Sequence, residues 1–459
     1  MKNIFRIILL LSLCACTKKL GLKPDTAIIL PESALDMERI LDNTDVMNLT
    51  GALPHVSSDE YFIPSLQEWQ SFSTATVRNA SVWNDKYYEG ESRIPDWTYP
   101  YNTIFYANSV LDVLSRQDIA EDGQKKVLQG WALFARSYAF YCLVSTFATP
   151  YQEATAAKDL GIPLRLHAGI DEIVQRATVK ETYNQIIKDL VSSAELLNRD
   201  IIPNKRNRPS KIAAYALLAR VYLSMRNYAL AEEYADKSRS LYSVLTDFNT
   251  LNKTAATAFT YNSEEIIYFT RQVSDYFEVS SGLRTTYGVR PELIALYSVN
   301  DLRLPIYFRI NSQGNHNSKP INSRTASPFT GLATDETLLI KAECLARRDE
   351  SAMALQLLDQ LAAKRWNPAG SNPAKPYIQL SVPQGQSVLD VVLRERQKAL
   401  IWRGLRWTDL RRLNLEGRNI IVQRKLNDQL FTLMPNSSKY VLPIPEDEIA
   451  MSGLQQNDR

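Results

Sequence analysis

Histidine and cysteine are scarce in this chain. Its 459 residues include only three histidines and four cysteines, which leaves little raw material for a metal site or for thiol chemistry. Lys and Arg number 53 and Asp and Glu number 50, so the formal net charge is +3. This near balance excludes a generally basic nucleic-acid binder and an acidic disordered chain. With 45% apolar and 22% charged residues, the composition is that of a globular protein.

Long hydrophobic runs are also missing, apart from one near the start. Lys2 and Arg6 precede an apolar run over residues 7–13 that is too short to span a bilayer and is typical of an export signal. The run leads into Leu13-Cys14-Ala15-Cys16, the pattern of a bacterial lipoprotein cleavage site. We therefore predict a signal peptide over 1–15, lipidation of Cys16 and a tether over 16–30. A plain secretory signal is the alternative.

Two cysteines remain after this segment. Cys142 and Cys344 each lie among apolar residues with helical spacing. Free Cys behaves as a small apolar side chain, so we predict two buried free thiols in preference to a disulfide between them.

Helical periodicity governs most of the chain after Trp97. Apolar residues recur at helical spacing over 97–114 and 124–146, and Thr178 with Glu181 forms a capping box at the start of another helix. Further helices are predicted over 210–225, 227–241, 387–404 and 406–417. These patterns predict a mostly α fold.

Two of the predicted helical hairpins carry the same spacing of alanines. Ala219 and Ala231 are twelve residues apart, as are Ala342 and Ala354. Tetratricopeptide repeats place small residues at this spacing because the two helices of each hairpin touch there. We predict tetratricopeptide-like hairpins over 211–241 and 335–366 within an α-solenoid scaffold. Two ordinary helical hairpins are the alternative.

Irregular segments interrupt the predicted helices. Residues 43–96 and 243–334 are rich in turn-forming and aromatic residues, with a short strand predicted at 265–270 and an exposed loop at 311–330. We predict one domain over 31–459, with its helical scaffold mainly in 97–241 and 335–415. The binding loops are expected mainly in 43–96 and 243–334.

Motifs of known catalytic chemistry are absent from the sequence. It has no Gly-rich phosphate loop, no Gly-x-Ser-x-Gly and no His-Glu-x-x-His. We predict no cofactor and no metal. A glycosidase-type carboxylate pair stays open, because the chain has many acidic residues and none is singled out.

Weak motifs nevertheless follow one another along the whole chain. After the cleavage site at Cys16 come Trp97-x-x-x-Tyr101-x-x-Ile104-x-x-Ala107-Asn108, Gly130-Trp131-Ala132-Leu133-Phe134-Ala135-Arg136-Ser137-Tyr138, Gly161-Ile162-Pro163-Leu164, Thr178-Val179-x-Glu181-x-Tyr183, Ser210-Lys211-x-Ala213-Ala214, Arg394-Glu395-Arg396, Gly404-x-Arg406-Trp407-x-Asp409-Leu410-Arg411-Arg412 and Leu442-Pro443-Ile444-Pro445. Taken together, the chain resembles the SusD/RagB-like outer-membrane nutrient-binding lipoproteins of Bacteroidetes. One departure is Arg403, which precedes Gly404 where the family often has Glu.

This resemblance implies a binding protein and not an enzyme. Such a protein is anchored by its lipid in the outer membrane, exposed at the cell surface, and pairs with a SusC-like TonB-dependent transporter as a hinged lid. Its ligands are oligosaccharides, and in some members peptides. Two further hypotheses are an envelope scaffold without a small ligand and an unrecognised hydrolase.

A sugar site needs exposed aromatic rings with polar groups at their edges. The candidate residues outside the predicted helices are the aromatics Tyr61, Trp69, Trp83 and Tyr287 and the polar residues Asn84 and Arg284. For each aromatic residue, packing in the core is the alternative.

Charged residues of both signs surround a predicted turn at Gly404. We expect Arg394, Glu395, Arg406 and Asp409 to form a partly buried ion network that holds the last helices. Their role is then structural.

Overall fold

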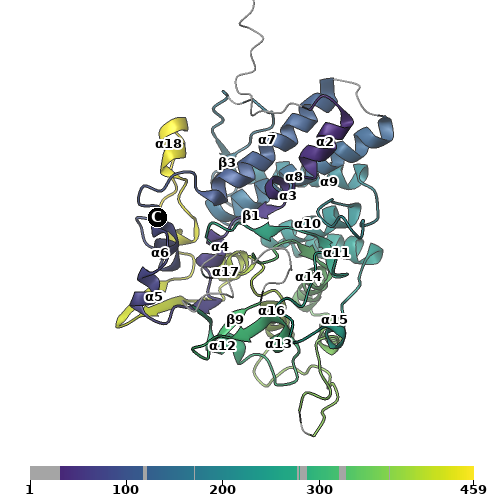
Figure 1. The fold of residues 1–459 in the computed structure, drawn as a ribbon, viewed down its shortest axis with the longest axis vertical. Helices are drawn as coiled ribbons and strands as arrows, with labels where there is room; N and C mark the ends of the chain where they lie inside the picture. Colours follow the sequence, from purple (N-terminus) through teal and green to yellow (C-terminus); the bar gives the residue numbers. More distant parts are fainter. Residues whose placement is uncertain are drawn as a thin grey trace, which may run out of the picture.

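The computed structural model describes residues 31–116, 121–169, 171–276, 279, 287–319, 327–371 and 373–459. The predicted signal peptide, the tether with Cys16, and Arg284 lie outside these residues. Figure 1 shows long helices together with short strands and loops that are spread over the molecule.

Long helices form the body, and each of them except the last packs on the one before it in the chain. They are α7 (Pro95–Arg116), α8 (Asp122–Phe147), α9 (Val179–Leu196), α10 (Lys211–Ser224), α11 (Tyr228–Leu241), α14 (Thr334–Arg347), α15 (Ser351–Ala363), α16 (Val388–Ala399) and α17 (Arg406–Asn414). The mostly α fold class is confirmed. The capping box at the start of α9 is also present, with Thr178 and Glu181 each bonding the other's backbone N–H.

The two predicted hairpins are α10–α11 and α14–α15. All four alanines that identified them are fully buried, and α11 packs directly against α14 although a long insert separates them in the chain. The turn of each hairpin also has a left-handed residue at the same place, Arg226 in the first and Asp349 in the second. The two hairpins are therefore structural repeats that stack side by side.

Residues 43–94, which we expected to be irregular, contain several short regular elements after helix α2 (Ala34–Leu41). These are α3 (Thr44–Met47), β1 (Leu49–Thr50), α4 (Leu53–Val56), β2 (Tyr61–Phe62), α5 (Leu66–Gln70) and α6 (Ala75–Ser81). Side-chain caps explain two of these helices: Ser65 accepts from the backbone N–H of Glu68, and Thr74 accepts from that of Val77.

Short strands pair in twos, some across long distances in the chain and others within local hairpins. They form the pairs β1 with β6 (Arg271–Gln272), β2 with β7 (Gly288–Val289), β3 (Leu160–Pro163) with β4 (Arg176–Thr178), β5 (Ile266–Tyr268) with β10 (Leu332–Ala333), β8 (Phe308–Ile310) with β9 (His316–Ser318), and β11 (Val422–Leu426) with β12 (Gln429–Leu433). The strand predicted at 265–270 is confirmed as β5.

The expectation of an exposed loop over 311–330 agrees with the exposure of residues 312–314 but is wrong for residues 317–318 and 327–330, which are buried, and residues 320–326 lie outside the described ranges. β8 and β9 form a hairpin there, in which Asn317 and Ser318 are buried. The remaining short helices are α12 (Pro291–Ile294), α13 (Arg303–Tyr307) and α18 (Glu446–Ser452), with 3-10 turns at Phe248–Thr250 and Ser438–Tyr440.

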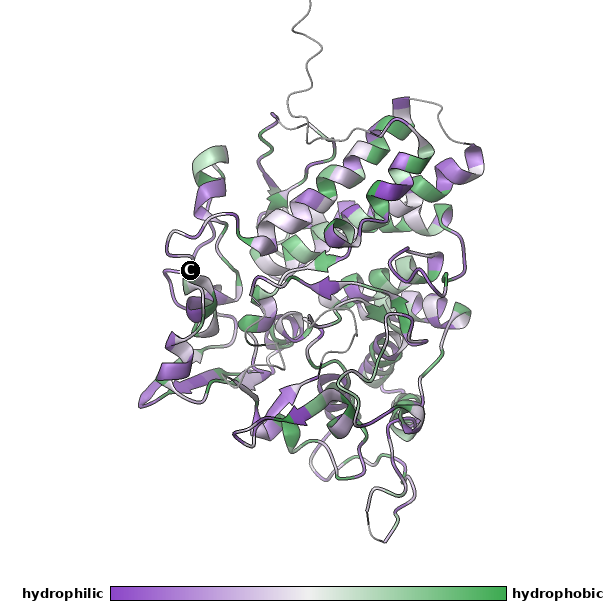
Figure 2. Cartoon of the chain, in the orientation of Figure 1, coloured by the Kyte–Doolittle hydropathy of each residue, from purple (hydrophilic) through white to green (hydrophobic). Residues whose placement is uncertain are grey.

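Apolar side chains gather in one large core cluster and in a smaller one between α14, α15 and α16. Figure 2 shows hydrophobic and hydrophilic residues alternating along the long helices, as amphipathic packing requires. Cys142 and Cys344 are both free, as predicted, although Cys142 is only half-buried. Within the described ranges, no helix is long and apolar enough to span a membrane.

Candidate ligand-binding site

A pocket opens where three distant segments of the chain meet. Its volume is about 580 Å³, and we call it the β2–β11 pocket. Its walls come from β2 and the residues after it, from the start of α12 and from the β11–β12 hairpin. The lining residues are Tyr61, Phe62, Ile63, Pro64, Arg290, Pro291, Glu292, Gln423, Arg424, Lys425, Asn427 and Leu430.

Strand pairing brings the first two walls together. Tyr61 is opposite Val289 and Phe62 is opposite Gly288 in the antiparallel β2–β7 pair, so Arg290 follows directly at the pocket. A Cβ atom at Gly288 would lie 2.7 Å from a ring carbon of Phe62. Glycine is therefore required for the Phe62 ring to lie over β7.

The third wall is the β11–β12 hairpin, whose turn contains Asn427 in the left-handed region. The Asn427 side-chain oxygen accepts a hydrogen bond from the backbone N–H of Leu66 at 3.5 Å. This contact links the tip of the hairpin to the first turn of α5.

Arg424 on β11 forms the floor of the pocket. Its guanidinium donates to the carbonyl oxygens of Ser58 at 2.8 Å and Tyr61 at 3.1 Å, and also to that of Ser81. It lies 4.1 Å from the centroid of the Tyr61 ring. Burial lowers the pKa of Arg424 below its usual value. The side chain thus joins the hairpin to β2 and to the end of α6.

The open part of the pocket combines an aromatic ring with polar groups. Phe62 is half-buried, Arg290 is partly exposed, and Glu292, Gln423 and Asn427 are exposed. An aromatic face with amides and charges at its edge is the arrangement that recognises a sugar ring and its hydroxyls.

Most of the aromatic residues that we proposed for the site are buried. Tyr61 and Trp83 are each 2% exposed and Tyr287 is fully buried. The expectation that these three rings are exposed is wrong, because they pack into a shared aromatic core. Tyr287 lies edge-on to Tyr61 and to Trp402, with ring centroids 6.3 Å and 5.9 Å apart. Of the three, only Tyr61 lines the pocket.

Trp69 and Asn84 are not among the residues that line the β2–β11 pocket. Trp69 belongs to α5, not to an irregular segment as we expected, and it is half-buried. Its indole N–H donates to the carbonyl of Arg78 at 3.0 Å and to the hydroxyl of Ser81 at 3.1 Å. Asn84 is exposed and donates to the Asn79 side chain at 3.1 Å.

Sequence reasoning missed Phe62, Arg290, Gln423 and Asn427. The alternation of buried and exposed residues over β11, followed by Asn427-Asp428, is a hairpin signal that we overlooked. No sequence signal placed this hairpin beside β2.

Three of the four residues predicted for one ion network make ion pairs in separate places. Glu395 pairs with Arg303 and Lys398, Arg406 pairs with Asp59, and Asp409 pairs with Arg396 and Arg412. Arg394 instead donates to the side chain of Gln386. Arg403, the departure from the family pattern, pairs with the buried Asp335 of α14 at 2.7 Å.

Two titratable groups are buried behind the pocket. Burial, with a smaller contribution from Asp59, raises the pKa of Glu60 to about 8. Burial lowers the pKa of His55 to about 3, and its ring stacks on Trp402 with centroids 4.4 Å apart. The two side chains approach to 3.7 Å, and both are mainly uncharged near neutral pH.

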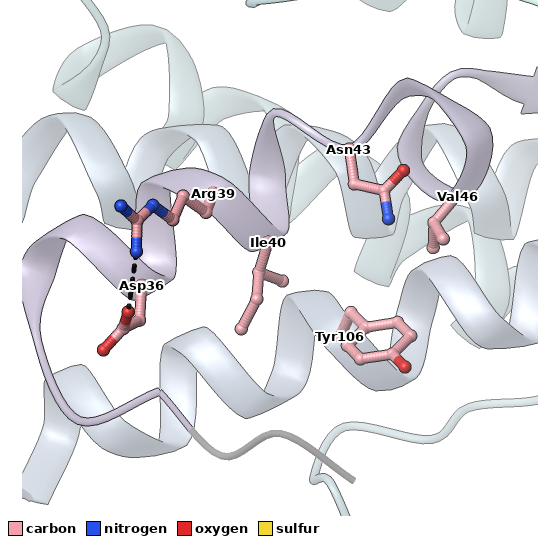
Figure 3. A pocket seen from close by; sticks show the side chains of 6 residues that line it. All are labelled: Asp36, Arg39, Ile40, Asn43, Val46 and Tyr106. Atoms are coloured by element: carbon pink, nitrogen blue, oxygen red, sulfur yellow. Dashed lines mark ion pairs between the residues drawn. The ribbon is translucent and has the colours of Figure 1, made fainter. Parts of the chain in front are cut away.

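Other cavities fit a sugar less well. One of about 310 Å³ lies between α2, α3 and α7. Figure 3 shows its lining, in which Asp36 and Arg39 form an ion pair with each other and Tyr106 is the one aromatic side chain among the described residues. Another, of about 290 Å³, lies between α7, β3 and α18. Its Trp97 is only 4% exposed, and the hydroxyl of its Tyr101 donates to the carbonyl of Pro163.

The fold and the pocket define a class of protein: a helical-repeat scaffold whose inserted segments enclose a pocket. Residues 19–223 match a family model described as "Starch-binding associating with outer membrane", and residues 310–459 match the model of the SusD family. The chain belongs to the SusD/RagB-like family, as its motifs indicated.

Solved structures show the same fold. A SusD superfamily protein from Bacteroides vulgatus is 23% identical with a TM-score of 0.72, over 93% of this chain and 98% of that one. A SusD-like carbohydrate-binding protein from the same organism is 18% identical with a TM-score of 0.66, over 92% and 97%. A laminarin-binding SusD-like protein is 19% identical with a TM-score of 0.64, over 92% and 98%. A search of the curated proteins finds no match.

Proposed function

We propose that this protein is an outer-membrane lipoprotein that binds oligosaccharides in the β2–β11 pocket and delivers them to a TonB-dependent transporter. The observation that carries the proposal is the Phe62 ring, which lies at the pocket beside the polar edge of Arg290 and Gln423. The names of the relatives support it, since one is called carbohydrate-binding and another laminarin-binding.

Delivery requires an anchor and a partner. Acyl chains on Cys16 would hold the protein at the outer membrane, and a SusC-like TonB-dependent transporter would receive the ligand as the protein closes over it. The description of the family model supports this location, because it associates the family with the outer membrane.

Binding fits the pocket better than hydrolysis does. Glycosidases use two carboxyl groups that flank the scissile bond. Among the described residues that line the pocket, Glu292 is the single Asp or Glu. This part of the lining offers a recognition surface without the pair of acids that glycoside cleavage needs.

Calorimetry with panels of glycans and of peptides tests this proposal. We expect heat from a glycan and a loss of at least tenfold in affinity for Phe62→Ala, which corresponds to about 1.4 kcal/mol. Phe105→Ala is the matched control, because Phe105 is equally half-buried but lies on α7 away from the pocket. The control should bind as the unaltered protein does.

Other results would redirect the proposal. Heat from peptides alone would replace the oligosaccharide by a peptide. Co-purification with a β-barrel transporter, without heat from either panel, would favour a scaffold. Equal losses for both phenylalanine variants would remove the β2–β11 pocket from the function.

A further inference from the structure

The β2–β11 pocket has an excess of positive charge. The described residues that line it include the three cations Arg290, Arg424 and Lys425 but only one acid, Glu292. The whole chain, by contrast, is nearly balanced in charge. The excess is therefore a local property of the pocket, and any part that it has in ligand selection rests on the proposed function.

Arg424 contributes a buried charge without a carboxylate partner. Its three side-chain nitrogens donate to backbone carbonyls of Ser58, Tyr61 and Ser81. The rings of Tyr61 and Trp83 lie beside the guanidinium, at 4.1 Å and 5.3 Å. Carbonyls and rings orient a cation, but they do not cancel its charge.

Arg290 is only partly neutralised. Its closest contact to Asp59 is 3.8 Å, and the two oxygens of Asp59 already accept hydrogen bonds from Arg406 at 2.7 Å and 2.8 Å. Its second partner is Glu292 at 3.2 Å, whose side chain is 71% exposed. Pairs with such exposed carboxylates are weak.

The nearby Glu60 does not compensate the positive charge around the pocket. Because its pKa is raised to about 8 by burial and by Asp59, this side chain is mainly protonated at neutral pH. Around the pocket, the cations Arg290, Arg406, Arg424 and Lys425 thus face the ionised carboxylates Asp59 and Glu292.

Lys425 brings a charge to the rim. It is exposed on β11 between two buried residues, and no described residue forms an ion pair with it. An exposed lysine with this freedom can reach a ligand in the pocket.

We propose that the pocket selects oligosaccharides that carry anionic groups, either uronate carboxylates or sulfate esters. An anion in the pocket would balance the positive charge that the surrounding carboxylates leave uncompensated. Both guanidinium and ammonium groups bind such anions through charge-assisted hydrogen bonds. A neutral sugar would gain none of this energy.

Calorimetry with pairs of charged and uncharged ligands tests the inference. The probes are oligogalacturonate and oligomannuronate with their methyl esters, and carrageenan oligosaccharides with their desulfated forms. We expect an anionic probe to bind at least tenfold more tightly than its uncharged partner, and to weaken between low and physiological salt. The uronate and sulfate arms tell the two anions apart.

Lys425→Gln gives the second measurement. We expect it to weaken binding of the anionic probe by about fivefold, as loss of one exposed ionic contact does, and to weaken binding of the uncharged probe less than this. Lys126→Gln is the control, because Lys126 is also exposed but lies on α8. The control should change neither affinity.

The failures are distinguishable. Equal affinity for charged and uncharged probes, binding of neutral glycans only, or full affinity in Lys425→Gln would overturn the charge selection and leave oligosaccharide binding intact. Absence of heat from every glycan, charged or neutral, would overturn both the charge selection and the proposed function.

Discussion

Replacing Glu343 with Gln tests the buried ion pairs that hold α17 against the helical scaffold. Glu343 lies on α14 with its side chain fully buried, and both its oxygens accept from the guanidinium of Arg412 on α17, at 2.5 Å and 2.8 Å. Arg347 also pairs with it at 2.9 Å. Burial alone would raise the pKa of Glu343, but these arginines outweigh burial and lower it.

The structure sets how much unfolding free energy Glu343→Gln is expected to lose. Arg412 is 1% exposed, so Glu343→Gln leaves a cation in the core with one of its two acids removed. Removing one partner of a buried pair costs about 3–5 kcal/mol. Asp409 still holds the Nε of Arg412 at 2.8 Å, so we expect a loss near the lower limit, about 3 kcal/mol.

Urea unfolding, followed by tryptophan fluorescence, measures this loss. The control is Glu232→Gln, which breaks a pair with the half-exposed Arg348 and should cost less than about 1 kcal/mol. If Glu343→Gln is no more destabilising than this control, Glu343 is not needed to compensate the buried charge of Arg412. That result would refute the reasoning about the buried ion pairs.

Three further predictions concern other parts of the chain. The pKa of Glu60 is raised from 4.5 to about 8, so the folded state keeps a proton that the unfolded state releases, and stability is lost as the pH rises through that range. In Glu60→Gln, the fall in unfolding free energy as the pH rises should be smaller by about 1–3 kcal/mol. A difference in melting temperature between variant and parent that does not change with pH would contradict this. Gly51→Ala places a Cβ 2.0 Å from an oxygen of the buried Asp96 and should destabilise by about 1–3 kcal/mol in thermal unfolding, whereas an unchanged melting temperature would show that Asp96 moves freely. Cys16→Ala should abolish membrane fractionation, and retention in membranes at high salt would argue against lipidation.

Local patterns in the sequence predict the scaffold well. The alanines at 219, 231, 342 and 354 identify both hairpins because the contact between two antiparallel helices recurs at a fixed spacing. The Thr178 and Glu181 capping box marks the start of α9 because its hydrogen bonds lie within one turn. These features depend on residues close together in the chain.

Exposure of aromatic residues is harder to predict. Tyr61, Trp83 and Tyr287 lie in polar, turn-rich stretches that resemble surface loops, yet they are buried. Their burial arises from β2–β7 pairing and from Arg424, which lies beside both Tyr61 and Trp83. Partners so distant in the chain leave no periodic signal around each aromatic residue.

Amino-acid order alone therefore defines the long helices, the cap of α9, the repeated hairpins and the family. Tertiary structure decides which charges pair and where a ligand has room. Arg406 meets Asp59, and the β11–β12 hairpin meets β2, across more than three hundred residues of chain. Helical periods repeat every few residues and are visible in the sequence, whereas contacts over such separations exist only after the whole chain has packed.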